Sequence, residues 1–303
     1  MIAVVGSVNM DLSVRTPRVP TRGENLLAHG LNVGLGGKGA NPSVAICRMG
    51  GHASFVGCVG DDGFGIQARE ALEREGVDIR GLCVAEDDPT GVALIMVDDE
   101  GQNTILVAIG ANQALQAADV EAVLQRLDPQ PDAIMVNFEI PESCVAAAVA
   151  FGDKRGITTV IDAGPPRPYA PSCYARASVL SPNRQEAEYM LGYQLSSPKT
   201  VERAACELRE LGPLSVVIKL GEHGAYVLSK HVAEVVPGYR VEAVDTTGAG
   251  DAFTAALTLG LARGQDILTA TRFACAAGAV TVTRLGALDA MPHAAEIRTL
   301  MDA

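Results

Sequence analysis

Asp245-Thr246-Thr247-Gly248-Ala249-Gly250-Asp251-Ala252-Phe253, residues 245–253, gives the most information about the fold and chemistry of this chain. A run with period-two alternation precedes it and an alanine-rich helical pattern follows it, so its glycines fall at a helix N-terminus. The first N–H groups of a helix have no partner inside it, and the helix dipole is positive there. Gly248, Ala249 and Gly250 are therefore predicted to present backbone donors to an anion such as a phosphate.

Asp251 directly follows these predicted donors. A carboxylate in this place would repel a phosphate unless it had a chemical task of its own. The alternative is that Asp251 only caps the helix, because aspartate is favoured at helix N-termini. The motif by itself leaves both interpretations open.

The composition indicates a globular protein without a basic surface for a polyanion. The 303 residues are 48% hydrophobic, enough for a large core, and the formal net charge is −12. Nucleic acids and anionic membranes both need a basic face, so neither is an expected partner. The seven cysteines form no Cys-x-x-Cys pair, which indicates buried thiols in a reducing compartment. Because no basic leader or long apolar segment is present, we expect a cytoplasmic protein.

Strand-like apolar runs alternate with helical patterns along most of the chain. This alternation is typical of βαβ units and predicts an α/β fold with a doubly wound, mostly parallel sheet flanked by helices. No linker is long or polar enough to mark a boundary, so residues 1–303 are expected to form one domain. Strands are expected at 2–5, 53–59, 133–136, 158–161, 178–180 and 216–219, and helices at 118–127, 141–153, 184–192 and 200–211.

Two segments with period-two patterns, about 12–36 and 90–110, do not fit this alternation. The second segment is predicted to form a hairpin, with strands at 91–97 and 104–109 joined by a turn at 98–101. Both segments are predicted to form a small β-sheet lid.

Polar side chains follow two of the expected central strands. Asn9 and Asp11 come after the strand at 2–5, and Glu139 comes after the strand at 133–136. Open α/β sheets bind ligands at the carboxyl ends of their strands, so these residues are candidates for a binding site. The alternatives are turn-forming residues at 9 and 11 and a solvated charge at 139.

A glycine-rich stretch, Gly36-Gly37-Lys38-Gly39-Ala40-Asn41, precedes the next helix. It is not a P-loop, because glycine rather than serine or threonine follows Lys38. Its glycines allow backbone to approach a ligand closely, while Lys38 and Asn41 offer donors for hydroxyl groups. A mobile turn with a solvated lysine is the alternative.

Two further motifs lie in the second half of the chain. Asn183 and Glu186 are three residues apart at a helix start, where they can share the hydration shell of a metal ion or form a capping box. Gly221 and Gly224 follow a strand, where they either let a base or phosphate approach or form a tight turn.

Taken together, these motifs resemble the ribokinase (phosphofructokinase-B) family of carbohydrate kinases over the whole chain. The stretch 36–41 is similar to one family signature and the stretch 245–251 to the other, in the right order and at the right separation. The resemblance implies a ribokinase-like fold and ATP-dependent phosphorylation of the primary hydroxyl of a sugar. D-ribose, converted to D-ribose 5-phosphate, is the first candidate.

The resemblance also implies roles for particular residues. Asp251 corresponds to the catalytic base of the family, and Gly248, Ala249 and Gly250 correspond to its anion hole. The implied sugar site consists of Asn9, Asp11, Gly37, Lys38, Asn41 and Glu139, with Ala93, Ile95 and Val107 from the hairpin as its apolar side.

Three cofactors are implied in the same way: ATP, Mg²⁺ and K⁺. Asn183 and Glu186 match the motif that organises Mg²⁺ and phosphate through water, and Lys219, Gly221 and Gly224 match the nucleotide loop. Lys219 replaces a common threonine, Pro42 a usual glutamine and Ala290 a usual serine beside the cation. The monovalent-cation site corresponds to Asp245, the carbonyl of Thr247, and carbonyls near Thr281, Arg284 and Gly286.

Three other functions are considered. A nucleoside kinase, or a fructose or deoxyribose kinase, would share the fold. A ligand-binding or regulatory protein on this scaffold would need a lost base or a broken anion hole, and both motifs are intact. A dehydrogenase would need the Gly-x-Gly-x-x-Gly fingerprint, which is missing after the first strand. Because an exposed sheet edge favours pairing, we also expect a homodimer formed through the lid.

Overall fold

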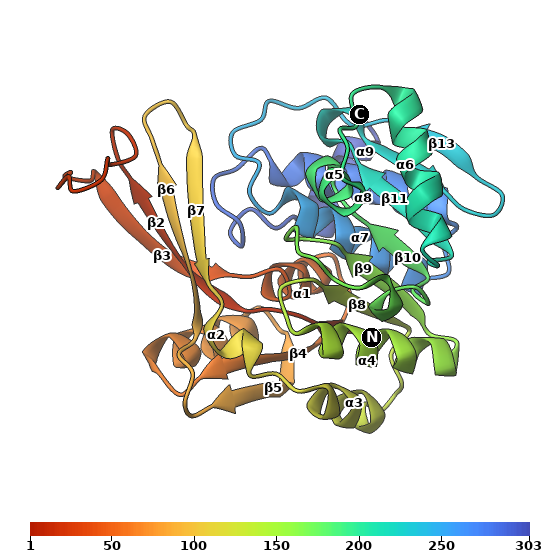
Figure 1. Ribbon diagram of the computed structural model, residues 1–303, viewed down its shortest axis with the longest axis horizontal. Coiled ribbons are helices and arrows are strands. Elements are labelled where there is room, and N and C mark those ends of the chain that lie inside the picture. The colour runs from red at the N-terminus through yellow and green to blue at the C-terminus, as the bar shows by residue number, and fades with distance from the viewer.

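A nine-stranded sheet forms the centre of the protein in the computed structural model, which describes residues 1–303 (Figure 1). The strand order is β13-β12-β11-β10-β9-β8-β1-β4-β5, and every neighbouring pair from β11 to β5 is parallel. The predicted α/β fold with a mostly parallel sheet is therefore confirmed. The strands are β1 (Ile2–Val5), β4 (Ala53–Gly60), β5 (Asp78–Ala85), β8 (Ala133–Asn137), β9 (Thr158–Asp162), β10 (Val179–Ser181), β11 (Ser215–Lys219), and the antiparallel β12 (Ala225–Leu228) and β13 (Ala233–Val236).

Helices cover both faces of this sheet, and the core is divided accordingly into two layers. In β1, Ile2 and Val4 belong to one layer and Ala3 and Val5 to the other, which explains its unbroken apolar sequence. The first layer is completed by α1 (Ala40–Arg48), α2 (Gly63–Arg74), α7 (Ala249–Ala262), α8 (Ile267–Thr281) and α9 (Ala294–Met301). The second is completed by α3 (Ala117–Arg126), α4 (Glu142–Arg155), α5 (Arg184–Leu191) and α6 (Pro198–Glu210).

A separate four-stranded sheet projects from one side of the α/β body (Figure 1). Its order is β3-β2-β6-β7, with β2 (Asn9–Arg15), β3 (Gly30–Gly36), β6 (Gly91–Val97) and β7 (Asn103–Ala108). The expected hairpin is confirmed as β6 and β7. The first segment starts at residue 9 rather than 12, because the chain enters β2 almost directly from β1. Asn9 and Asp11 therefore lie on the small sheet itself.

Some elements differ from the expectation. The strands β5, β12 and β13 and the helices α8 and α9 are additional. All seven cysteines are free thiols, but only four of them are buried. Cys47 and Cys83 are half-buried and Cys206 is exposed, so the expectation of buried thiols is wrong for these three. None of the helices combines the length and apolarity that crossing a membrane requires.

Candidate active site

A cavity of about 360 Å³ opens between the small sheet and the carboxyl ends of the central strands. Every residue of the predicted sugar site lines it, and so do five residues predicted to contact the nucleotide. The former are Asn9, Asp11, Gly37, Lys38, Asn41, Ala93, Ile95, Val107, Glu139 and Asp251, and the latter are Asn183, Glu186, Lys219, Gly248 and Gly250. Ile105, Pro165, Thr246 and Ala287 line it as well and were not predicted.

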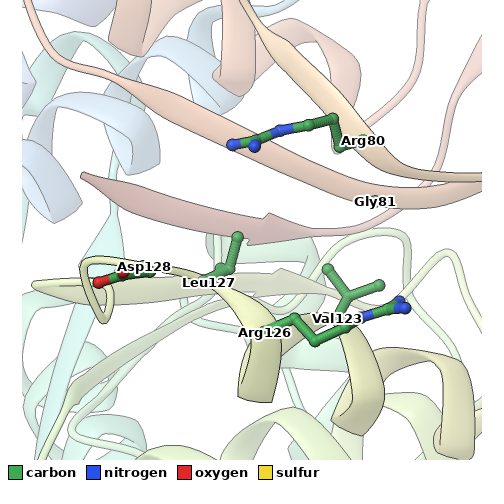
Figure 2. Close-up of a pocket in the computed structure, with 6 residues that line it drawn as sticks. All are labelled: Arg80, Gly81, Val123, Arg126, Leu127 and Asp128. Atoms are coloured by element: carbon green, nitrogen blue, oxygen red, sulfur yellow. The ribbon is translucent and has the colours of Figure 1, made fainter.

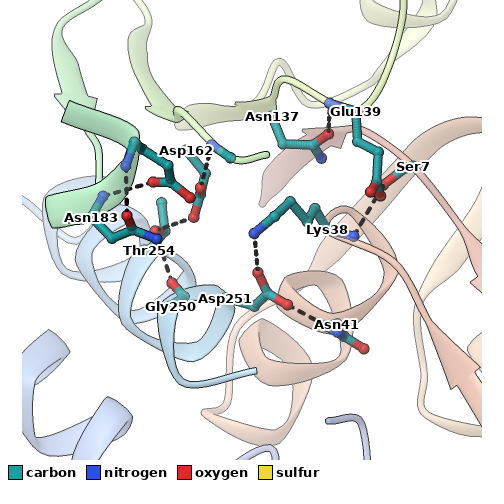
Figure 3. A network of polar contacts seen from close by, with 12 residues as sticks. Ser7, Lys38, Asn41, Asn137, Glu139, Asp162, Asn183, Gly250, Asp251 and Thr254 are labelled. Atoms are coloured by element: carbon teal, nitrogen blue, oxygen red, sulfur yellow. Dashed lines mark hydrogen bonds and ion pairs between the residues drawn. The ribbon is translucent and has the colours of Figure 1, made fainter. Parts of the chain in front are cut away.

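The carboxylate of Asp251 does not cap its helix. Gly248 is the N-cap of α7, no side chain caps this end, and Asp251 is the third helical residue. Instead Asp251 Oδ2 accepts a hydrogen bond from Asn41 Nδ2 (2.9 Å), and Oδ1 lies 3.4 Å from Lys38 Nζ (Figure 3). The capping alternative is therefore wrong, and the carboxylate is aimed at the glycine-rich stretch 36–41.

The N-terminus of α7 offers unpaired donors beside this carboxylate. The backbone N–H groups of Gly248 and Gly250 have no hydrogen-bond partner, whereas that of Ala249 donates to the carbonyl of Thr246 (3.3 Å). Gly248 has a φ of 78°, which favours glycine, and a Cβ there would lie 2.7 Å from Met291 Cε and 3.2 Å from Ala287 Cα. Two of the three expected donors, the N–H groups of Gly248 and Gly250, are thus free to bind an anion.

Lys38 carries its charge into the centre of the cavity. Burial opposes the charge on its ammonium group, but four carboxylates, of which Asp251 acts most strongly, hold its pKa well above the usual value. The Lys38 backbone N–H donates to Ser7 Oγ (3.0 Å), which fixes the start of the glycine-rich stretch against the end of β1. Lys38 therefore remains protonated at neutral pH.

A second polar group faces Lys38 from the end of β8. Glu139 Oε2 accepts a hydrogen bond from Ser7 Oγ, and the Glu139 backbone N–H donates to Asn137 Oδ1 (2.9 Å) (Figure 3). Glu139 Oε2 also accepts a hydrogen bond from Asn9 Nδ2 (3.1 Å). Ser7 was not predicted, although its position directly after β1 is the signal that identified Asn9. Residues from two strand ends therefore form one hydrogen-bonded wall.

The carboxyl group of Asp11 is held in an unfavourable environment. Burial, followed by the negative charges of Glu139 and Asp251, raises its pKa to about 7. A Cβ at Gly36 would lie 2.2 Å from Asp11 Oδ2, so the absence of a side chain there makes room for the carboxyl group. The carboxyl group of Asp11 therefore has a pKa near neutral pH.

The small sheet also supplies an apolar part of the cavity wall, next to Asp11, which pairs with Ala93. This part is formed by Ala93 and Ile95 on β6 and by Ile105 and Val107 on β7. Ile105 was missed, although it lies two residues from Val107 and therefore on the same face of the strand.

A buried ion pair lies beneath the N-terminus of α7. Lys219 Nζ is 2.9 Å from Asp162 Oδ2 and 3.3 Å from Thr254 Oγ1, and Thr254 Oγ1 also contacts the carbonyl of Gly250 (3.0 Å). Burial would raise the pKa of Asp162, but Lys219 and then Lys38 lower it to about 2. Asp162 and Thr254 were not predicted. Asp162 ends β9, so the strand-end signal could have found it, whereas Thr254 has no local signal.

Asn183 and Glu186 form the capping box that the sequence allows. Asn183 Oδ1 accepts from Glu186 N (2.8 Å), and Glu186 Oε2 accepts from Asn183 N (2.6 Å). Burial raises the pKa of Glu186. Its Oε1 receives no hydrogen bond and would lie 2.4 Å from a Cβ at Gly164, so a glycine keeps this oxygen accessible. Mg²⁺ usually keeps several waters and binds few carboxylates plus phosphates, so this single free oxygen fits it.

Of the remaining predicted residues, Thr247 lines the cavity, whereas Gly221 and Gly224 do not. Gly221 and Gly224 flank the 3-10 turn η3 (Gly221–His223) with φ values of 62° and 88°. A Cβ at Gly224 would lie 2.0 Å from the carbonyl oxygen of Val236. The tight-turn interpretation of these glycines is therefore correct, whatever else the turn contacts.

The side chain of Asp245 connects two segments of the predicted cation site, one at Thr247 and the other at Gly286. Its Oδ1 accepts from Thr247 N (2.9 Å) and its Oδ2 from Gly286 N (2.9 Å), and these bonds outweigh burial and lower its pKa. The backbone N–H of Arg284 donates to the carbonyl of Thr281 (3.3 Å). An ionised carboxylate among loop carbonyls fits a hard monovalent cation. The nearby Ala290 is fully buried and offers no side-chain oxygen.

A second cavity, of about 320 Å³, lies between β5 and α3 (Figure 2). The side chains of Arg80 and Arg126 extend in opposite directions there. Arg80 is paired with Asp78 (2.8 Å), and Arg126 Nε donates to the carbonyl of Ala122 (3.1 Å). The two guanidinium groups therefore do not converge on a common ligand position.

The fold and the first cavity together define a carbohydrate kinase. The chain belongs to the pfkB family of carbohydrate kinases, whose family model matches residues 1–294.

Named relatives and solved structures agree with this family. The chain is 36% identical to a ribokinase of Schizosaccharomyces pombe, covering 98% of this chain and 96% of the relative. It is 31% identical to a deoxyribokinase of Salmonella typhi, covering 96% and 95%. The structure of Arabidopsis thaliana ribokinase complexed with ribose and ATP matches with a TM-score of 0.90 at 28% identity, covering 100% and 98%. Ribokinase of Thermotoga maritima matches with a TM-score of 0.87 at 32% identity, covering 100% and 99%.

Proposed function

We propose that this protein is an ATP-dependent sugar kinase that converts D-ribose to D-ribose 5-phosphate. One observation carries the proposal: the buried carboxylate of Asp251 lies at a helix N-terminus whose Gly248 and Gly250 N–H groups are unpaired, and it faces a polar cavity. The ribokinase relatives and the ribose and ATP complex of the Arabidopsis thaliana enzyme support the choice of substrates.

Asp251 acts as the general base in this proposal. A primary hydroxyl is too weak an acid to attack a phosphate unaided, so Asp251 accepts its proton as the bond to the γ-phosphorus forms, and ADP leaves. The N–H groups of Gly248 and Gly250 receive the charge on the transferred phosphoryl group. Such a base contributes about 10²–10⁴ in rate, and the remainder comes from positioning and charge stabilisation.

The sugar is held by the wall that contains Asn9, Asp11, Asn41 and Glu139. Carboxylates accept and carboxamides both donate and accept, so these groups can bind vicinal hydroxyls in pairs. Gly37 and Lys38 contact the sugar from the glycine-rich stretch. The apolar part of the wall that the small sheet supplies contacts the ring.

The phosphates of ATP are held on the other side of Asp251. Lys219 supplies positive charge, Gly221 and Gly224 shape the nucleotide loop, and Asn183 and Glu186 hold Mg²⁺ through water. Mg²⁺, when bound, neutralises charge on the phosphates. K⁺ is held by Asp245, Thr247 and the carbonyls near Thr281, Arg284 and Gly286, and the alanine at 290 favours weak activation by this ion.

The small sheet is proposed to close over the sugar as a lid of a single-domain protein, and to pair with a second copy. All six residues of its edge strand β7 are exposed, and an unpaired edge favours such pairing. Light scattering should give the mass of a dimer at micromolar concentration. Only monomer there would count against the pairing. The free thiols favour a reducing compartment, the cytoplasm.

A coupled assay of ADP release tests the substrate. Ribose, deoxyribose, fructose, adenosine, inosine and cytidine are compared with ATP as donor, and ribose is expected to give the highest kcat/KM. The deoxyribokinase relative makes deoxyribose the second candidate. A preference for a nucleoside or for fructose would replace the proposed substrate while leaving the kinase chemistry in place.

A further inference from the structure

A buried asparagine that the sequence did not single out, Asn112, lies at the base of the small sheet. It belongs to the 3-10 turn η1 (Gly110–Gln113) just after β7, and its side chain is fully buried. Its Oδ1 accepts from Val8 N (2.9 Å). Its Nδ2 lies 2.9 Å from the carbonyl of Ile109 and 2.8 Å from Oδ1 of Asn9. One carboxamide therefore joins the end of β1, the end of β7 and the sugar wall, the part of the cavity formed by Asn9, Asp11, Asn41 and Glu139.

The orientation of the Asn112 amide is fixed by backbone groups. Only an oxygen can accept the Val8 N–H, and only an N–H group can face the carbonyls of Val8 (3.0 Å) and Ile109. The two hydrogens of Asn112 Nδ2 are shared among three oxygens, those of Val8, Ile109 and Asn9. Because this nitrogen cannot accept a hydrogen bond, the Asn9 atom that faces it must be the oxygen.

The same argument continues from Asn9 to Glu139. Because Oδ1 of Asn9 faces Asn112, Nδ2 of Asn9 must face the cavity, where it donates to Glu139 Oε2 (3.1 Å). One of the two Nδ2 hydrogens is used in this bond, and the other is available to a sugar hydroxyl. The Val8 backbone thus fixes the orientation of the Asn112 amide, and Asn112 in turn fixes the orientation of the Asn9 amide.

Gly91, the first residue of β6, packs against this pair of amides. A Cβ at Gly91 would lie 2.3 Å from Asn9 Oδ1 and 2.4 Å from Asn112 Nδ2. The hydrogen bond between the two amides is therefore enclosed by the start of one lid strand and the end of the other.

We propose that Asn112 is a positioning residue for sugar binding. It holds the Asn9 carboxamide with its N–H groups toward Glu139 and the sugar, and it couples this orientation to the base of the small sheet. The inference rests on the proposed function and adds a residue to the recognition of the sugar. Without Asn112, the Asn9 amide can turn over and place its carbonyl oxygen beside the Glu139 carboxylate.

Steady-state kinetics of Asn112→Ala with ATP and D-ribose test this role. The KM for ribose is expected to rise roughly tenfold, because a buried hydrogen-bonded group loses its partner, while kcat changes little. Thr271→Val is the matched control, since Thr271 is as buried as Asn112 and its hydroxyl donates to the carbonyl of Ile267 (2.7 Å) within α8. It is expected to lower Tm without changing the KM.

A double-mutant cycle with Asn9→Ala separates positioning from general destabilisation. If Asn112 acts through Asn9, adding Asn112→Ala to Asn9→Ala leaves the KM for ribose unchanged. An unchanged KM in the single variant, or the same fold-increase in both backgrounds, would overturn the proposal. Asn112→Leu avoids the cavity that alanine leaves and also cannot orient the Asn9 amide, so it replaces the alanine variant if that protein does not fold.

Activity of the wild-type enzyme with ribose tests the proposed substrate separately from the positioning role of Asn112. Absence of ribose-dependent ADP release from it would contradict the proposed substrate alone. The cycle is then measured with the sugar that the substrate panel identifies, and the same outcomes decide the role of Asn112.

Discussion

Lys38 Nζ lies 3.4 Å from Oδ1 of Asp251, although 213 residues separate them in the chain. The contact joins the glycine-rich stretch at the start of α1 to the N-terminus of α7. It places a protonated amine and a carboxylate at the boundary between the proposed sugar and phosphate positions. Asp251 is therefore oriented by this attraction and by the hydrogen bond from Asn41, not by helix capping.

Removing the positive charge of Lys38 should therefore impair catalysis. Lys38→Met keeps the length of the side chain but leaves the surrounding carboxylates without their cation. We expect kcat to fall by about 10²–10³, because charge on the transferred phosphoryl group loses a stabilising partner. Steady-state kinetics with ATP and ribose measure this, with Lys230→Met, at an exposed lysine outside the cavity, as the control. Similar activity in both variants would exclude a catalytic role for the Lys38 charge.

The buried pair of Lys219 and Asp162 allows structural and functional effects to be separated. Lys219→Met leaves a buried carboxylate unpaired, so it should cost about 3–5 kcal/mol of stability and raise the KM for ATP. Asp162→Asn in the same protein removes the unpaired charge. The double variant should therefore recover most of the stability, measured by urea unfolding, but not the KM for ATP. Recovery of both would mean that Lys219 is only structural.

The raised pKa of Asp11 predicts a pH-dependent affinity for the sugar. The ionised carboxylate is the better acceptor for sugar hydroxyls, and with a pKa of about 7 it becomes protonated as the pH falls. The kcat/KM for ribose should then decrease about tenfold between pH 8 and pH 6. Asp11→Asn should have a lower kcat/KM for ribose, and this kcat/KM should no longer decrease between pH 8 and pH 6. An unchanged decrease in that variant would assign the titration to another group.

The same carboxyl group should affect stability with the opposite sign. Its pKa is higher in the folded protein than the ordinary value of 3.8, so protonation favours folding. This contribution is complete below about pH 4 and is lost as the pH rises through about 7. Thermal unfolding of Asp11→Asn should therefore show a higher Tm than the wild type at pH 8 and little difference at pH 4. A variant that is less stable at pH 8 would contradict the unfavourable placement of this carboxylate.

Much of the main sheet could be predicted because its strands are buried on both faces. The apolar run Ile2–Val5 is an example, since each residue packs into one of the two core layers. The edge strand β5 was missed because it contains the exposed Arg80 and the glycine Gly81, which interrupt an apolar pattern. Edge strands need fewer apolar residues, so their sequences resemble loops.

The candidate site was predictable where residues directly follow strands or form a glycine-rich stretch. Asn9, Glu139 and Asp251 are found in this way. Thr254 and Asn112 are not, because their roles depend on partners 92 and 104 residues away, Asp162 and Val8, respectively. An isolated threonine in a helix or asparagine in a turn has no local pattern that reveals such a contact.

Gly248→Ala tests the geometry of the anion site. A Cβ there meets Met291 and requires a left-handed backbone, so the helix start should shift and kcat should fall at least about 10²-fold. Gly264→Ala, just beyond the C-terminal end of α7, is the control, because its φ of 77° is nearly the same but its surroundings are open. Both variants should lose about 1 kcal/mol of stability from backbone strain, measured by urea unfolding. Equal kcat values for the two would argue against anion binding by Gly248.

The turnover rate of Asp251→Asn is the most direct test of the proposed chemistry. Asparagine preserves the size of the side chain but cannot accept the proton of the sugar hydroxyl at neutral pH. We expect kcat for ATP and ribose to fall by roughly 10²–10⁴, with little change in ribose binding measured by calorimetry. A variant that phosphorylates ribose at nearly the wild-type rate would contradict the assignment of Asp251 as the base.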